Sequence, residues 1–246
     1  MASTADHPIP DNMIKIPNRA FARRGDLTSV TIPDSGTHIG IGAFCCCRNL
    51  ISVNIPNSVS VIEESAFSGC RSLTRMTIPA SVTYIGEKAF LECMSLTNVR
   101  IPNSVTEIGY RTFHLCVALT SVRIPNSVTY IGEAAFRSCN CLTSMTIPDS
   151  VTHIGTRAFE NCSSLTSVRI PNSVTGIGYR AFHLCVALGC DPEVPDPEVP
   201  ELLIRKLTRS VWSGRSRRTS RRTCVSEHGD PGAPIRGGRA EKRVQP

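Results

Sequence analysis

Cysteine is the residue type in this 246-residue chain with the most obvious capacity for metal or redox chemistry, and there are twelve of them. Small zinc domains hold the metal with paired CxxC motifs, which this sequence lacks. Seven of the cysteines instead follow one another at intervals of 23 residues. The spacing therefore indicates a buried stack of small thiols, one from each unit of a repeat. These cysteines are Cys47, Cys70, Cys93, Cys116, Cys139, Cys162 and Cys185.

Disulfides between neighbouring repeats are an alternative for this cysteine stack, because stacked Cα atoms can fall within bridging distance. A metal site is a third alternative. Residues 1–15 lack the apolar core of a signal peptide. We therefore expect a chain that is not exported, a cytoplasmic location and reduced thiols, with a nuclear or cell-surface location as the alternatives.

Motifs of common enzyme classes do not occur: there is no GxxxxGK[ST], no HExxH and no GxSxG. The GIG segments at 40–42 and 176–178 resemble part of a dinucleotide loop, but each is a repeat glycine with one substituted neighbour. His114 and His183 are copies within the same duplicated HLCVAL segment, which favours packed or solvated imidazoles over catalytic ones. We expect no enzyme activity, no cofactor and no metal.

The elements that must position these residues are 23-residue repeats. Leucine recurs from Leu27 to Leu188, phenylalanine from Phe21 to Phe182 and proline from Pro10 to Pro171, each in steps of 23. Seven complete units fill residues 27–187, each close to LTSVxIPxSVTxIGxxAFxxCxx. Residues 1–26 are interpreted as a degenerate N-terminal repeat or cap. Positions within a unit are numbered below from the leucine as position 1.

The apolar residues at positions 1, 4 and 6 alternate with polar ones and predict a short strand with one buried face. Proline at position 7 should end that strand after the isoleucine. Positions 10 and 13 should turn inward again, and glycine at position 14 should supply a left-handed or tight turn. The AFxxC segment that follows predicts a single helical turn with phenylalanine pointing inward.

One unit cannot fold alone, because its six large apolar side chains contribute about 9–18 kcal/mol, whereas ordering 23 residues costs about 35 kcal/mol. Stacked units supply the difference, which predicts a right-handed solenoid with a parallel sheet along one face. The LxxVxI pattern followed by serine, as in LTSVRIPNSV at 119–128, resembles a leucine-rich repeat, and the IGxxAFxxC half resembles the BspA-like subclass. The resemblance covers residues 9–188.

This resemblance implies an α/β leucine-rich-repeat solenoid, with a parallel sheet of short strands on the concave face and short helical turns on the convex side. It also implies a non-enzymatic scaffold for protein or glycan recognition, a role often linked to adhesion. Family members bind through residues outside the buried strand positions, and no catalytic residue is shared among them.

Outward-facing residues at positions 3, 5 and 8 are therefore the candidate contacts with a partner. Three arginines at position 5 predict a basic line that binds an acidic partner. No aromatic anchor accompanies them. The candidates are Arg75, Asn98, Arg100, Asn103, Arg123, Asn126, Arg169 and Asn172.

A second outward stripe at position 12 is interpreted mainly as side chains lying over a flank of the solenoid, and partner contact is the alternative. It comprises His38, Tyr84, Glu107, Tyr130 and His153, with Tyr110 and Tyr179 three positions further on.

Charge separates the repeats from the C-terminal tail. Residues 1–200 contain 15 Lys and Arg against 16 Asp and Glu, whereas residues 201–246 contain 12 against 4. Residues 188–200 are a truncated repeat and a proline-rich acidic linker, and 201–246 are expected to be mostly disordered. The basic tail gives an alternative function, a regulator that contacts nucleic acid or directs nuclear import. Its candidate contacts are Arg215, Arg217, Arg218, Arg221 and Arg222.

Residues 202–212 have helical apolar spacing at Leu203, Leu207 and Val211. We expect this segment to cover the open C-terminal edge of the solenoid, with end-to-end self-association as an alternative. The segment could also lie on a membrane surface or bind a partner, although no stretch of the chain is long enough to span a membrane. The abrupt loss of the repeat is also what a frameshift would produce.

Overall fold

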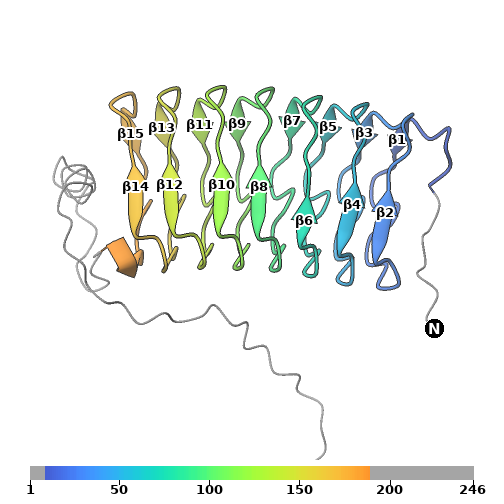
Figure 1. Ribbon diagram of the computed structural model, residues 1–246, viewed down its shortest axis with the longest axis horizontal. Coiled ribbons are helices and arrows are strands. Elements are labelled where there is room, and N and C mark those ends of the chain that lie inside the picture. The colour runs from blue at the N-terminus through green and yellow to red at the C-terminus, as the bar shows by residue number, and fades with distance from the viewer. Residues whose placement is uncertain (1–8, 189–246) are drawn as a thin grey trace, which may run out of the picture. The chain divides into compact units, whose positions relative to one another are not determined.

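The computed structural model describes residues 9–188, which form the expected solenoid (Figure 1). In Figure 1 the chain rises through one row of strands, descends through a second row behind it and advances from right to left, which is a right-handed progression. The expectations for residues 189–246, which include the linker, the segment 202–212 and the basic tail, lie outside the described residues.

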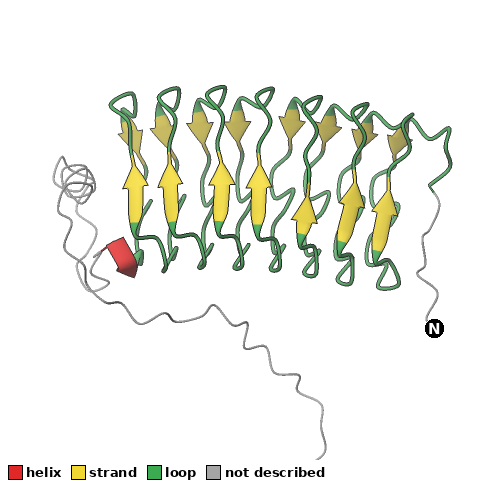
Figure 2. Cartoon of the chain, viewed as in Figure 1, coloured by secondary structure: helices red, strands yellow, loops and turns green. Residues whose placement is uncertain are grey.

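The front strands occupy positions 3 to 5 and pair in parallel with a register of one repeat, so that Ser121 lies beside Asn98. Each strand ends before the isoleucine that was expected to be its last residue, and loops make up most of each unit (Figure 2). The front strands are β2 (Ser29–Thr31), β4 (Ser52–Asn54), β6 (Arg75–Met76), β8 (Asn98–Arg100), β10 (Ser121–Arg123), β12 (Ser144–Thr146) and β14 (Ser167–Arg169).

A second row of strands, absent from the sequence-based expectation, occupies positions 12 and 13. Each has an outward residue followed by a position-13 isoleucine, which is buried in most units, and the strands again pair in parallel. The rear strands are β1 (Lys15–Ile16), β3 (His38–Ile39), β5 (Val61–Ile62), β7 (Tyr84–Ile85), β9 (Glu107–Ile108), β11 (Tyr130–Ile131), β13 (His153–Ile154) and β15 (Gly176–Ile177).

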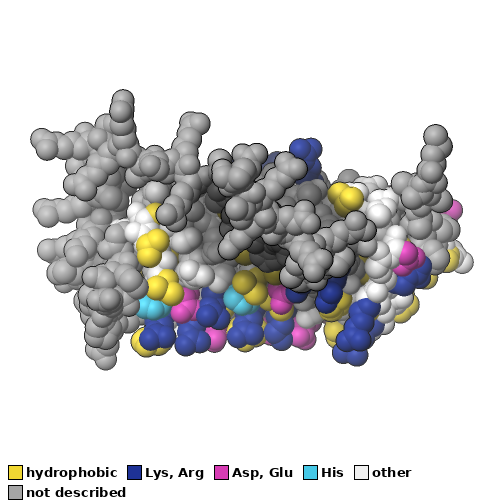
Figure 3. Space-filling view, turned by 90° about the horizontal axis from the view of Figure 1, so that it is seen from below, with side chains coloured by type: hydrophobic (Ala, Val, Ile, Leu, Met, Phe, Trp, Pro, Cys, Tyr) yellow, Lys and Arg dark blue, Asp and Glu magenta, His cyan; other side chains and the backbone are white. Residues whose placement is uncertain are grey.

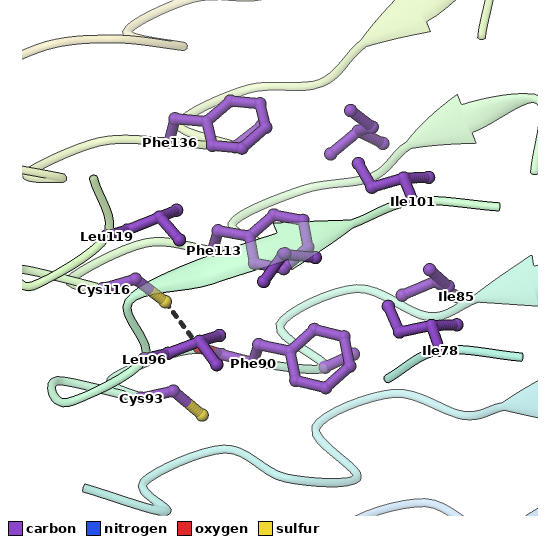
Figure 4. Packing of buried hydrophobic residues seen from close by; sticks show 14 of the residues in the cluster. Ile78, Ile85, Phe90, Cys93, Leu96, Ile101, Phe113, Cys116, Leu119 and Phe136 are labelled. Atoms are coloured by element: carbon purple, nitrogen blue, oxygen red, sulfur yellow. Dashed lines mark hydrogen bonds between the residues drawn. The ribbon is translucent and has the colours of Figure 1, made fainter. Parts of the chain in front are cut away.

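A continuous column of phenylalanine rings runs through the core between the two rows of strands. It contains all eight phenylalanines of the chain. From Phe21 to Phe182, neighbouring ring centroids are 5.2–5.7 Å apart and the ring planes differ by 3–10°. Figure 4 shows part of this column, with leucines and cysteines to one side of it and isoleucines to the other. Stacked aromatic pairs add about 0.5–1.5 kcal/mol each beyond the burial of their area.

The AFxxC segment is not the helical turn that the sequence predicted. Positions 16 and 20 have positive φ in every unit, as at Arg111 (52°) and Leu115 (61°). The N–H groups of positions 16, 18 and 20 donate to carbonyls of the next unit, including Phe113 N–H to Ala135 O at 2.8 Å. The intervening N–H groups donate three residues back within their own unit, as Cys116 does to Phe113 O at 3.2 Å. A helical turn would direct every N–H group along its own axis and make no such ladder. Within residues 9–188 the one helix is the 3₁₀ turn η1 (Val186–Leu188).

Glycine at position 14 begins the tight turn that was one of the two expectations, since Ala135 N–H donates to Gly132 O at 3.3 Å, but it does not take the left-handed conformation that was the other. Positive φ values among the described glycines occur at Gly42 and Gly69 and not at position 14. A Cβ atom at Gly132 would lie 2.8 Å from both the carbonyl carbon of Gly109 and the carbonyl oxygen of Ile108. Glycine is therefore required there because the backbones of neighbouring units approach closely.

The cysteine stack is buried, as predicted, and its seven members have no exposed surface. Each thiol donates to the phenylalanine carbonyl of the preceding unit, as Cys116 Sγ does to Phe90 O at 3.2 Å (the dashed line in Figure 4). The ten cysteines within residues 9–188 are free thiols. Burial raises the pKa of the Cys116 thiol to about 12. Position 21 thus favours a small residue that carries a donor.

We expect thiol-reactive probes to label the stacked cysteines slowly in native protein and rapidly in denaturant, because the reactive thiolate is both covered and disfavoured. Mass spectrometry of labelled peptides measures the rate at each cysteine. Rapid labelling of Cys93, Cys116 and Cys139 in native protein would contradict the assignment.

Stability should fall at alkaline pH, because unfolded thiols ionise near pH 8.5 while the buried thiols keep their protons. The contribution of the buried thiols to stability is complete below that pH and is lost as the pH rises toward the folded pKa of about 12 at Cys116. Each fully shifted thiol should remove about 1.4 kcal/mol from the free energy of unfolding between pH 7.5 and 9.5. Urea unfolding of wild type and Cys116→Ala measures this, and an identical pH dependence in the two proteins would contradict it.

Candidate functional site

The regularly repeated hydroxyl groups hold the units together and are not free for a partner. Ser127 Oγ donates to Val105 O at 2.6 Å, and Thr129 Oγ1 donates to Thr106 O at 3.3 Å. Thr120 Oγ1 donates to Thr97 O at 2.9 Å on the other side of the unit. Candidate functional residues therefore lie at the positions that vary between units.

The front face carries all eight predicted contact residues, and all eight are exposed. The strand register sets Arg100 directly beside Arg123, and it sets Arg75 beside Asn98. Arg169 lies beside Thr146, so one strand separates it from Arg123. The outward orientation predicted for positions 3 and 5 is therefore confirmed.

A first depression, of about 530 Å³, opens in the front face where β10 and β12 are not paired. The wider step between these strands can be followed in Figure 1. Val122 is half-buried there, whereas Val99 and Val168 in the same position are buried. Three of the predicted residues line the depression, and the other five lie outside it. The polar lining residues are Ser121, Arg123, Asn126, Ser144, Thr146, Asp149 and Arg169.

The charges of the first depression are only loosely paired. Arg169 Nη2 lies 3.7 Å from Asp149 Oδ1, and the two side chains are 66% and 78% exposed. Such a pair contributes little to stability, so a partner's carboxylate can compete for the arginine. The lining contains neither histidine nor cysteine, so its serines lack an adjacent imidazole or thiolate base.

A second depression, of about 430 Å³, lies on the rear face where β7 and β9 are not paired. In the neighbouring units the position-14 N–H donates to the isoleucine carbonyl of the preceding unit, as Gly132 does to Ile108 at 2.7 Å. Within residues 9–188 no such bond joins Gly109 to Ile85. The depression is lined by Tyr84, Ile85, Glu87, Glu107, Gly109, Tyr110, Tyr130, Gly132 and Glu133.

Sequence reasoning named four of these residues as part of a flank stripe but missed Glu87, Glu133 and the opening itself. The available signal was a second set of glutamate and tyrosine residues at position 15, in register with the set at position 12. The interruption between β7 and β9 has no counterpart in the repeat pattern.

A mixed charged row lies along the turns (Figure 3). Glu160 is central to it: its side chain is 7% exposed, and it lies 2.5 Å from Arg137 Nε and 3.9 Å from Arg157 Nε. His114 is buried with Nδ1 2.9 Å from Arg137 O, and burial lowers its pKa. The contacts of Arg137 with Glu160 and with His114 connect neighbouring units, so the row is structural and His114 is a packed side chain.

Among the described residues, no group of three or more histidine, cysteine, aspartate or glutamate side chains is placed to hold a metal ion. The part of the chain between residues 9 and 188 also contains no helix long and apolar enough to cross a membrane.

Comparison with known proteins matches these repeats to a family profile. The profile of a BspA type leucine rich repeat region, with six copies, matches residues 3–119 and 62–189. No curated protein matches the chain.

Three solved structures of leucine-rich repeat proteins are similar to the chain. That of T. pallidum is 27% identical over 82% of this chain and 78% of its own, with a TM-score of 0.54. One from Eubacterium ventriosum is 28% identical over 69% of this chain and 44% of its own length, with a TM-score of 0.59. One from Bacteroides ovatus is 28% identical over 71% of this chain and 57% of its own length, with a TM-score of 0.46. The chain thus spans less than two thirds of the length of the last two proteins.

Two glycine substitutions test the interruption between β7 and β9. Gly132→Ala should lower the free energy of unfolding by about 1–3 kcal/mol, because the new Cβ would be forced against backbone. Gly109→Ala should change it by less than about 0.5 kcal/mol, because the nearest atom would be 3.7 Å away. Urea unfolding measures both, and equal losses would show that the ladder is closed at this step.

Proposed function

Since the chain belongs to the BspA-type leucine-rich repeat family, we propose that its repeats are a non-enzymatic scaffold that recognises a partner protein through the front face. The observation that carries this proposal is the first depression, where the unpaired strands β10 and β12 leave a polar recess in the front face. A recess lets a partner side chain be surrounded, which a flat sheet does not.

The charge and chemistry of the front face favour an acidic segment as the partner. Arg123 and Arg169 line the recess, Arg100 lies beside Arg123, and one aspartate opposes them. Serine, threonine and asparagine side chains around the arginines can donate further hydrogen bonds to carboxylates. Positions 3 and 5 carry no aromatic ring, so the face lacks a stacking surface for sugars, and a protein is favoured over a glycan.

Replacing Arg100, Arg123 and Arg169 together with serine should change the melting temperature by less than about 2 °C, because all three side chains are exposed. The same change should lower the affinity for an acidic partner by about tenfold or more, and it should reduce the salt dependence of that binding. Arg75→Ser, on the same face but outside the recess, is the matched control and should have a smaller effect.

Affinity capture with the full chain and with the triple variant measures this difference, followed by titration of each captured partner at two salt concentrations. Partners held equally by both proteins, or a variant that unfolds, would contradict the assignment of the face.

The basic tail supports a second proposal, contact with nucleic acid, because residues 201–246 carry 12 basic against 4 acidic residues. Capture with residues 1–190 and with the full chain in parallel separates the two functions. Partners held by the short form support the scaffold, and nucleic acid held by the full chain alone supports the tail.

A further inference from the structure

We propose that the second depression binds an arginine side chain of a partner peptide. It lies on the rear face, between β7 and β9, and is separate from the front-face recess of the proposed function. Its ligand therefore has the opposite charge to the partner of the front face.

Tyrosine and glutamate alternate across this depression in two registered rows. At position 12 the order along the solenoid is Tyr84, Glu107, Tyr130, and Tyr130 is directly beside Glu107 in the strand register. At position 15 the order is reversed, with Tyr110 between Glu87 and Glu133. Any cation that enters the recess thus meets both carboxylates and ring surfaces.

The tyrosine rings have the exposure and geometry that cation binding requires. Arg111 lies over Tyr110 with its guanidinium carbon 4.8 Å from the ring centroid, and Lys88 Nζ lies 5.4 Å from the same centroid. Tyr84 and Tyr130 are 43% and 42% exposed, and within residues 9–188 neither ring has such a cation. Their ring faces can accept a guanidinium from outside the chain.

The lining of the recess carries three glutamates and no lysine or arginine. The cations nearest to it in the described structure are Arg111 and Lys88, both beside Tyr110. Lys88 is paired with Glu64 at 3.2 Å, so it neutralises a carboxylate outside the lining. Glu87, Glu107 and Glu133 are exposed, and the described part of the chain provides no ion pair for any of them. Burial and the surrounding glutamates raise the pKa of Tyr84, as expected where negative charge accumulates.

The broken ladder adds a backbone acceptor to these side chains. Ile85 is 5% exposed, and in the described structure its carbonyl lacks the N–H donor that the following unit supplies elsewhere. A backbone carbonyl without a donor from the protein can accept a hydrogen bond from an N–H group of a ligand that reaches it. A ligand with several N–H groups satisfies it while binding the carboxylates.

These three features together select arginine over lysine. A guanidinium is planar, stacks on tyrosine and presents five N–H donors in a fork that matches a carboxylate. An ammonium group is a compact, strongly hydrated charge that does not stack in this way. A bare metal ion does not suit the site, because the described carboxylates are not grouped closely enough to coordinate one.

Fluorescence anisotropy of the full chain with three labelled peptides tests the proposal at 150 mM salt. The peptides share a glycine and serine sequence and carry two arginines, two lysines or two citrullines. The arginine peptide should bind at least fivefold more tightly than the lysine peptide, and the citrulline peptide should not bind, because it keeps the shape without the charge. Equal affinity for arginine and lysine would overturn the proposal, since it would indicate attraction by charge alone.

Matched variants locate the binding. Glu107→Gln should lower the affinity for the arginine peptide about tenfold. The double variant Tyr84→Leu, Tyr130→Leu should abolish the preference for the arginine peptide over the lysine peptide. Asp34→Asn removes the same charge from another exposed position and should leave binding unchanged. Glu107 is exposed, so its replacement should leave the fold intact. Unchanged binding of the arginine peptide by Glu107→Gln would therefore overturn the proposal.

The front-face triple arginine variant separates this site from the proposed function. It should bind the arginine peptide as wild type does. Loss of binding by that variant would overturn the rear-face assignment, whereas failure of the front-face experiment alone leaves the rear-face result intact.

Discussion

The hydrogen bonds between the turns of successive units are the interaction on which the rest of this structure depends. Both rows of strands are interrupted once, but the turn ladder at positions 16, 18 and 20 continues from the first described unit to the last. It requires left-handed backbone at two positions per unit, mostly in residues other than glycine, at a cost of about 1–2 kcal/mol each. The ladder and the adjoining phenylalanine column offset that cost, and both demand a constant length of chain between units.

That constraint explains why much of the fold could be predicted from the sequence. A buried residue such as Phe113 contacts its own copies one repeat away, so the identity of each buried position is repeated in the sequence. The solenoid, the front strands and the buried cysteines follow from this. The rear strands and the turn conformation do not, because two-residue strands have too little alternation to detect and the AFxxC spacing also suits a helix.

The candidate sites were less predictable, for a related reason. Outward positions could be assigned from alternation, and Arg123 and Arg169 were found in this way. The two depressions arise where neighbouring strands are not paired. Whether two strands pair depends on small displacements between their units, which a repeated sequence does not predict. Glu87 and Glu133 gain their possible role from that opening and not from any motif of their own.

The two interruptions also have a mechanical consequence. At the step between β7 and β9 the units stay joined by the front strands β6 and β8, and at the step between β10 and β12 they stay joined by the rear strands β11 and β13. Each step is also held along the turns by the continuous ladder. We therefore expect a bending load to open the unpaired face first, which is the rear face at one step and the front face at the other. The compliance of this solenoid should then be greatest at these two steps and lower in the units between them, where both rows of strands are paired.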